Sequence, residues 1–217
     1  MERLRTWKIP LPGGGKVTAK YRPADGRVGM LLAHGAGVGQ DAPFMVSMRD
    51  GLAAAGYGVM TFNYPYMEAG RRAPNRMPVL LDCHRTAFER LSLNHDAVIL
   101  SGKSMGGRMA SHIAAEGIGD GLVVFGYPLV PFGKGEARST DHFKAIRQPT
   151  LFVQGSRDAL GPLDKIRPRL RKISNAAIHV IPDADHSFRV PRRSHKSQSE
   201  IMQELIDITA TWISDHL

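Results

Sequence analysis

The sequence has almost no cysteine and no long apolar run, and both absences narrow the class of protein. Cys83 is the single cysteine in 217 residues, so the chain cannot form an internal disulfide, as is usual for proteins of a reducing compartment. No segment approaches the ~20 apolar residues of a membrane-spanning helix. Residues 1–8 carry charges throughout and lack the apolar stretch of a secretory signal. We therefore expect a cytoplasmic protein without a membrane partner, in which Cys83 is structural.

Acidic residues are also few compared with basic ones. The 29 lysines and arginines outnumber the 20 aspartates and glutamates, which gives a formal net charge of +9 and a pI near 10.0. A basic face attracts phosphates without any specific motif. However, the basic clusters at 71–76, 165–172 and 189–196 contain no interleaved aromatic residues that would form a stacking platform. We interpret them as solvated faces or the positive rim of a pocket, and expect no nucleic-acid partner.

What the chain does contain is an alternation of strand-like and helix-like segments, which we expect to form one domain over residues 1–217. Apolar, β-branched runs occur at residues 28–33, 59–62, 97–100, 122–125, 150–153 and 177–181. Helical patterns occur at 44–55, 77–93, 105–116 and 163–173, and a last segment sets Ile201, Leu205, Ile208 and Trp212 on one face. This alternation predicts the α/β class, with a mostly parallel sheet covered by helices on both faces.

The N-terminal part of the chain has a different pattern. Strand-like segments at 6–9 and 17–21 flank a turn made of Pro12 and three glycines. Such an arrangement predicts an antiparallel hairpin, which we place at the edge of the sheet.

The most informative motif is Gly-Lys-Ser-Met-Gly-Gly at residues 102–107. It follows the apolar run at 97–100 and precedes the helical segment at 105–116. A serine on a tight strand-to-helix turn projects its hydroxyl, and the flanking glycines let the backbone fold that sharply. Ser104 is therefore the candidate nucleophile. Because Gly-x-Ser-x-Gly also arises by chance, the assignment depends on partners elsewhere in the chain.

A serine hydroxyl needs an imidazole to take its proton and a carboxylate to orient that imidazole. His186 follows the last strand-like run, and Asp158 is the first acid after the run at 150–153. Both then lie at the carboxyl ends of parallel strands, the edge at which such sheets carry their sites. The chain order Ser104, Asp158, His186 is that of an α/β-hydrolase triad.

The oxyanion of an acyl-transfer reaction needs two backbone donors. The N–H of Met105 comes directly after Ser104 at a helix start, so it is the first candidate. The second comes from the loop after residues 28–33, where we assign Ala36, with Gly37 as the neighbouring alternative. We interpret His34, in the same loop, as a buried anchoring residue, because a triad uses one histidine.

Two nucleotide-binding motifs are excluded because their glycines would have to stand at positions where this sequence has other residues. Residues 102–104 resemble the end of a phosphate-binding P-loop, but that motif requires glycine where this chain has Ala97. A dinucleotide fingerprint starting at Gly35 would need glycine at Gln40. The remaining histidines lack metal-ligand spacing with an acidic third ligand. We therefore predict no cofactor and no metal.

Four segments together resemble a known family: the His-Gly-Ala-Gly loop at 34–37, the elbow at 102–108, Gly-Ser-Arg-Asp at 155–158 and Asp-His-Ser-Phe at 185–188. They are similar to dienelactone-hydrolase-like α/β-hydrolases, and more narrowly to a small group related to a hydrolase-like subunit of a chromatin-acetylating complex. The resemblance implies a triad of Ser104, Asp158 and His186, with Ala36 and Met105 as oxyanion donors.

This sequence differs in two respects from well-known members of the family that it resembles. Dienelactone hydrolases proper use a cysteine nucleophile, so Ser104 argues against carrying their substrate over. Many relatives insert a helical cap after the strand that corresponds here to 122–125. The segment at 126–148 is too short for a large one.

We therefore predict a serine hydrolase, specifically a carboxylesterase that acts on small or short-acyl esters. Gly37, Tyr64 and Tyr66 are candidate substrate contacts, although the tyrosines serve equally well as loop packing. A hypothesis for Arg71, Arg72 and Arg76 is that they favour anionic substrates. The alternatives are a non-catalytic interaction protein on a hydrolase scaffold, or a peptidase or acyltransferase with the same triad.

Overall fold

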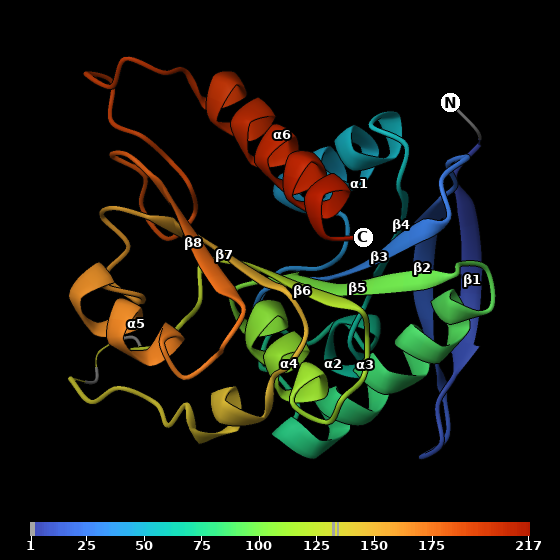
Figure 1. Ribbon diagram of the computed structural model, residues 1–217. Coiled ribbons are helices and arrows are strands. Elements are labelled where there is room, and N and C mark those ends of the chain that lie inside the picture. The colour runs from blue at the N-terminus through green and yellow to red at the C-terminus, as the bar shows by residue number, and fades with distance from the viewer. Residues whose placement is uncertain (1–2, 132, 134) are drawn as a thin grey trace.

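The computed structural model describes residues 3–131, 133 and 135–217, and its centre is an eight-stranded sheet (Figure 1). Residues 1 and 2, which belong to the charged N-terminal stretch, lie outside the described residues, as do 132 and 134 of the segment at 126–148. The strands are β1 (Arg5–Pro10), β2 (Lys16–Arg22), β3 (Val28–Ala33), β4 (Gly58–Phe62), β5 (Ala97–Lys103), β6 (Gly121–Phe125), β7 (Thr150–Gly155) and β8 (Ala176–Ile181).

The strand order is β1-β2-β4-β3-β5-β6-β7-β8. β1 pairs with β2, and β2 with β4, in antiparallel register, whereas all the other pairs are parallel. The hairpin therefore forms the edge of the sheet, as the sequence predicts. The prediction of a mostly parallel α/β sheet is confirmed.

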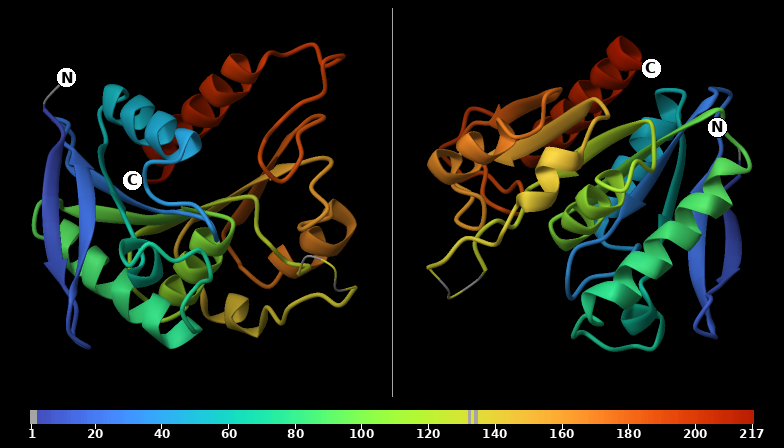
Figure 2. Two further views of the ribbon diagram at one scale, coloured as in Figure 1. Left: turned by 180° about the vertical axis from the view of Figure 1, so that it is seen from behind. Right: turned by 60° about the horizontal axis from the view of Figure 1, so that its bottom comes forward.

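Helices cover both faces of the sheet (Figure 2). The helices are α1 (Pro43–Ala54), α2 (Pro65–Glu68), α3 (Met77–Ser92), α4 (Met105–Ala114), α5 (Leu163–Leu170) and α6 (Gln198–His216), with a 3-10 helix at Asp141–Ala145. On one face, Met48 of α1 and Leu205 of α6 share a buried cluster with Leu32 of β3. On the other, Leu80 of α3 and Met109 of α4 pack into a second cluster. Each central strand is thus buried on both sides, which explains its continuous apolar sequence.

The predicted elements agree with the structure to within a few residues, with two exceptions. α2 and the 3-10 helix have no counterpart in the predictions. They contain only four and five residues, too short for a helical period to show in the sequence. α5 ends at Leu170 rather than at 173.

The connection from β6 to β7 holds no second domain, and its described residues contain only the 3-10 helix. The absence of a large cap, expected from the sequence, is therefore confirmed for the described part of the chain. Among the helices formed by the described residues, none has the length and apolarity to cross a membrane. The carboxyl ends of β3, β5, β7 and β8 consequently lie open at one edge of the sheet, where the candidate residues follow.

Candidate active site

Ser104 occupies a sharp turn between β5 and α4. Its φ of 52° and ψ of −115° are rare for a residue with a side chain. Conformations of this kind cost of order 1–3 kcal/mol and persist where the surroundings enforce them. The Ser104 N–H donates to the carbonyl of Phe125 in β6 at 2.9 Å, which anchors the turn to the neighbouring strand.

Two glycines make this turn sterically feasible. A Cβ atom on Gly102 would lie 2.4 Å from the carbonyl carbon of Gly106, and one on Gly106 would lie 2.3 Å from the carbonyl oxygen of Ala33. Side chains at these positions would push α4 away from β5 and β3. The glycine spacing in the motif therefore reflects close packing of helix against sheet as well as the turn itself.

A chain of hydrogen bonds runs from Ser104 through His186 to Asp158. The Ser104 Oγ lies 2.8 Å from His186 Nε2, and His186 Nδ1 lies 2.8 Å from Asp158 Oδ2. An ionised carboxylate only accepts, so Nδ1 carries the proton and Nε2 is left to accept from the serine. The His186 side chain keeps 22% exposure while that of Asp158 has none. His186 is therefore a partly exposed base, and the buried carboxylate of Asp158 fixes its orientation.

The Asp158 carboxylate is held in place by its own loop and by β7. Its Oδ1 accepts the N–H groups of Leu160 and Gly161 at 2.8 and 3.2 Å. Gln154 donates to Oδ2 from its side-chain amide, and that amide also accepts the N–H of Tyr127 at 3.0 Å. These contacts satisfy the buried carboxylate and fix its direction toward His186.

The loop after β3 lies against the serine. A Cβ on Gly35 would be only 3.6 Å from Ser104 Cβ, and Ala36 lines both of the cavities that reach Ser104. Met105 is the first residue of α4, where the N–H has no partner within the helix. Both predicted oxyanion donors thus belong to segments that border Ser104.

His34 anchors this loop from the inside. Its Nε2 accepts the N–H of Tyr64 at 3.1 Å, so Nδ1 carries the proton and donates to the carbonyl of Gly35 at 2.8 Å. Burial lowers the pKa of His34 to about 4, against the opposing effect of the Gly35 hydrogen bond. The imidazole is therefore neutral and fully engaged, in agreement with the anchoring interpretation.

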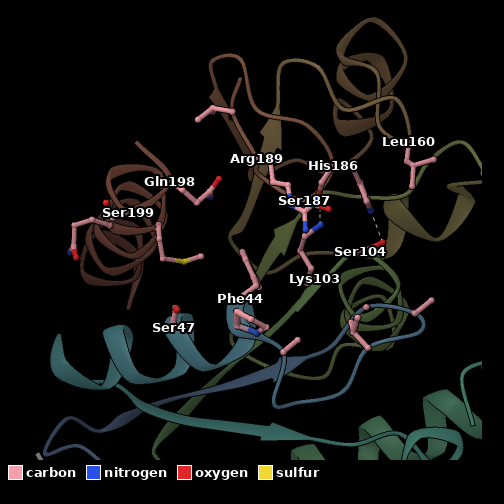
Figure 3. Close-up of a pocket in the computed structure, with 18 residues that line it drawn as sticks. Phe44, Ser47, Lys103, Ser104, Leu160, His186, Ser187, Arg189, Gln198 and Ser199 are labelled. Atoms are coloured by element: carbon pink, nitrogen blue, oxygen red, sulfur yellow. Dashed lines mark hydrogen bonds between the residues drawn. The ribbon is translucent and has the colours of Figure 1, made fainter. Parts of the chain in front are cut away.

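Ser104 lies between two cavities. The larger has a volume of about 1040 Å³ and extends between α1 and α6 (Figure 3). Phe44 and Ser47 border it on one side and Gln198 on the other, with His186 beside Ser104. The smaller, of about 340 Å³, is formed by α3, α4 and the β6–β7 connection. Together they offer one space for each half of a molecule that is cleaved at Ser104.

The predicted substrate contacts lie elsewhere. Tyr64 and Tyr66 are completely buried, and their hydroxyls bond to His84 Nδ1 at 3.0 Å and to the carbonyl of Gly35 at 3.4 Å. Gly37 is exposed with a φ of 74°. None of the three lines the larger or the smaller cavity. The tyrosines support the loop after β3 from behind, as their packing alternative predicts.

Lys103 has a structural role at this site that is not among the roles predicted from the sequence. The Lys103 ammonium donates a hydrogen bond to the carbonyl oxygen of His186, and a Cβ on Gly126 would lie only 2.9 Å from Nζ. Burial lowers the pKa of Lys103 to about 8, while the charges of Asp158 and Asp185 oppose the shift. A lysine at the end of a buried strand, directly before Ser104, was the available signal. Its charge ties the elbow directly to the His186 loop.

A second serine–histidine contact occurs on α4, away from both ends of the hydrogen-bond chain. Ser111 Oγ lies 2.9 Å from His142 Nε2, but it donates its single proton to the carbonyl of Arg108 at 2.7 Å. His142 must therefore donate to the serine rather than accept from it. Its ring stacks on that of His112 with centroids 3.7 Å apart.

No metal centre is apparent in the part of the chain that the structure describes, because it contains no group of three or more histidine, cysteine, aspartate or glutamate side chains placed to hold an ion.

Known structures share this fold over nearly the full chain. A dienelactone hydrolase from Anabaena variabilis is similar with a TM-score of 0.81 and 20% identity, covering 99% of this chain and 98% of its own. The protein XC6422 from Xanthomonas campestris, described as an α/β serine hydrolase without a lid, has a TM-score of 0.77 and 17% identity over 98% and 96%. The esterase Pf2001 from Pyrococcus furiosus has a TM-score of 0.78 and 15% identity over 99% and 93%.

At such identities these likenesses establish the fold alone. The family model of the alpha/beta hydrolase domain matches residues 26–214, which include β3 to β8 and every residue of the hydrogen-bond chain. This chain therefore belongs to the α/β-hydrolase family.

Proposed function

We propose that this protein is a serine carboxylesterase that hydrolyses small or short-acyl esters with Ser104 as nucleophile, His186 as general base and acid, and Asp158 as the group that orients His186. The observation that carries the proposal is the unbroken hydrogen-bond chain of two 2.8 Å contacts that ends at a serine between two cavities.

The reaction follows from this geometry. Ser104 Oγ attacks the ester carbonyl carbon while His186 Nε2 takes the serine proton. The carbonyl oxygen becomes an oxyanion, stabilised by the backbone N–H groups of Ala36 and Met105. As the tetrahedral intermediate collapses, the carbon–oxygen bond to the alcohol breaks and His186 returns the proton to the departing alcohol. Water then attacks the acyl-serine by the same steps, which releases the acid and restores Ser104.

The volume of the smaller cavity, about 340 Å³, supports a short substrate group on that side of Ser104. The described part of the β6–β7 connection forms no lid, and glycine-rich loops border Ser104. The described residues form no cover over Ser104 that would exclude water from an acyl-enzyme, which favours hydrolysis over transfer to another alcohol. The narrower resemblance to the subunit of a chromatin-acetylating complex stays a prediction from the sequence motifs.

The first experiment is covalent labelling with a fluorophosphonate, read by intact mass. We expect the parent protein to gain one label and the Ser104→Ala variant to gain none. Ser111→Ala is the matched control on the same helix, since its serine also contacts a histidine but donates its proton elsewhere. We expect it to label like the parent.

The outcomes separate the alternatives. A folded parent that takes no label contradicts the esterase proposal and favours a non-catalytic interaction protein. If Ser104 is labelled, hydrolysis of para-nitrophenyl butyrate supports an esterase. Turnover of peptides instead, or partition of the acyl group to alcohols over water, would assign the site to a peptidase or an acyltransferase.

A further inference from the structure

The smaller cavity combines an apolar wall with a cationic end. Its apolar lining includes Met77, Leu80 and Met109, and its polar lining comes from Asn75, Arg108 and Arg138. Arg108 lies one helical turn beyond Ser104 and donates its backbone N–H to the Ser104 carbonyl at 3.0 Å. The guanidinium groups therefore belong to the same cavity as the nucleophile.

Two polar atoms of this lining are buried without a partner. Neither Nε of Arg108 nor Oδ1 of Asn75 has a hydrogen-bond partner among the described residues. Buried polar atoms are nearly always satisfied by protein, water or a ligand. Arg108 Nε can only donate, so a group that binds it from this cavity must be an acceptor, whereas Asn75 Oδ1 can only accept and leaves the amide nitrogen of Asn75 as the donor toward such a group.

The charges of the lining residues indicate whether a group that binds in this cavity is an anion or a cation. Arg108 donates from Nη2 to the sulfur of Met77 at 3.6 Å and lies close to the Tyr127 hydroxyl, and Arg138 donates to the carbonyl of Pro128 at 3.2 Å. Within the described residues, neither forms an ion pair with a carboxylate, Glu136 of the same loop included. Burial is the main cause that lowers the pKa of Arg108; Tyr127 opposes this shift, and the nearby positive charge of Arg138 adds to it. Two adjacent cations without an acidic partner favour an anion between them.

The position of His186 indicates whether the acyl half or the alcohol half of an ester occupies the smaller cavity. His186 lines the larger cavity and not the smaller one. Since the imidazole must protonate the departing alcohol, the alcohol half lies on the side of the larger cavity. The acyl half then extends into the smaller cavity, toward the two arginines.

We propose that the smaller cavity is a subsite for a carboxylate at the far end of the acyl group, so that the preferred substrates are monoesters of short dicarboxylic acids. The inference rests on the proposed esterase function and names its substrate class. Arg108 and Arg138 bind the carboxylate, the amide of Asn75 hydrogen-bonds to it, and the methionines contact the methylene chain.

The test compares two esters of equal acyl length, the para-nitrophenyl monoester of glutaric acid and para-nitrophenyl pentanoate. We expect the parent to favour the anionic ester in kcat/KM by about tenfold or more, as charge-assisted hydrogen bonds imply. Arg108→Gln and Arg138→Gln should each lower that preference by about tenfold, mainly through KM. Added salt should also reduce it.

Arg167→Gln is the matched control. Arg167 is exposed and lines neither cavity, so its loss removes the same charge without the same contact, and the preference should stay as in the parent. A separate Arg71→Gln variant tests the hypothesis for Arg71, Arg72 and Arg76, which a lower preference for the anionic ester would support. Should Arg108→Gln fail to fold, the exposed Arg138 still provides the decisive variant.

The results distinguish the two proposals. Hydrolysis of both esters at equal kcat/KM, or an unchanged preference in Arg138→Gln, overturns the carboxylate subsite and leaves the esterase in place. If neither ester is cleaved and fluorophosphonate does not label Ser104, the esterase proposal fails and the subsite fails with it.

Discussion

The described residues form two serine–histidine contacts of nearly equal length, and the two contacts have very different surroundings. Ser104 and His186 meet at 2.8 Å at the open edge of the sheet, and Ser111 and His142 meet at 2.9 Å on the side of α4. Only the first pair has a carboxylate on the far nitrogen of the imidazole. Only the first serine has a backbone φ of 52°.

The difference shows that distance alone does not make a nucleophile. Burial, reinforced by the positive charges of His112 and Arg108, lowers the pKa of His142 to about 3. Burial is also the main cause that lowers the pKa of His112 to about 4. A ring with so little affinity for a proton is a poor general base, and Ser111 directs its proton to a carbonyl. Proton direction, a carboxylate and open space distinguish the candidate site from the second pair.

The largest effect on activity is expected when the carboxylate of Asp158 is removed from the Ser104 pair. Asp158→Asn keeps the size of the side chain but no longer fixes the proton of His186 on Nδ1. We expect kcat for para-nitrophenyl butyrate to fall by about 10⁴-fold with little change in folding. Steady-state kinetics and a circular dichroism spectrum provide the measurement.

Asp141→Asn is the control for this prediction. Asp141 is adjacent to His142 in the chain and is exposed, and its carboxylate bonds to Ser139. Its replacement should leave kcat within about twofold of the parent, as surface substitutions usually do. Equal losses in the two variants would mean that Asp158 has no special role.

A smaller effect is expected from removing Lys103, whose ammonium group lies beside the Ser104 pair. Lys103→Met removes the hydrogen bond to the His186 carbonyl, and we expect kcat to fall about tenfold, the value of one charge-assisted hydrogen bond. The pH profile adds a signature. Because the pKa of Lys103 is about 8, the parent loses the ammonium charge above that pH, so its activity should decline there.

The Lys103→Met variant should lack this alkaline decline, since it has no charge to lose. A pH–rate profile between about pH 6 and 10 for both proteins, with matched ester, makes the comparison. The same decline in both proteins would show that another group titrates, and would remove Lys103 from the positioning of His186.

The smallest effect is expected on the free energy of unfolding, whose pH dependence includes a contribution from His142 of the second pair. The pKa of His142 is about 3 in the folded protein, below its ordinary value of about 6.5. The unfolded chain therefore binds more protons between these values, so the folded state loses stability as the pH falls through this range. His142→Gln should weaken that pH dependence by about 1 kcal/mol, less than the full shift because the half-buried ring is partly screened.

Urea unfolding at about pH 7.5 and 4.5 tests this prediction. The variant is compared with the parent at each pH, so that any loss from the missing Ser111 contact appears at both values and cancels in the difference. His34 and His84, whose pKa values burial lowers to about 4 and about 3, should leave part of the dependence in place. An unchanged difference between the two pH values would contradict the lowered pKa of His142.

Several features of the fold and site were predictable because they have short-range signals. Continuous apolar runs marked the buried parallel strands, and glycines around Ser104 marked a turn that no larger residue allows. The position of His186 just after a strand was visible for the same reason. By contrast, Tyr64 and Tyr66 follow a strand end as binding residues often do, yet their side chains turn into the core. Side-chain direction at a loop depends on what packs behind it.

The sequence by itself determined the succession of strands and helices along the chain, the turn at Ser104 and the candidate residues that could act with this serine. Each of these follows from apolar periodicity or from backbone sterics within a few residues. Only the tertiary structure decided which histidine meets which serine, how Lys103 reaches the His186 loop, and that Arg108 and Arg138 share one cavity. These contacts join residues 28 to 83 positions apart, or depend on the path of a loop. Local patterns carry no information on such distances, since the packing of helices against both faces of the sheet sets them.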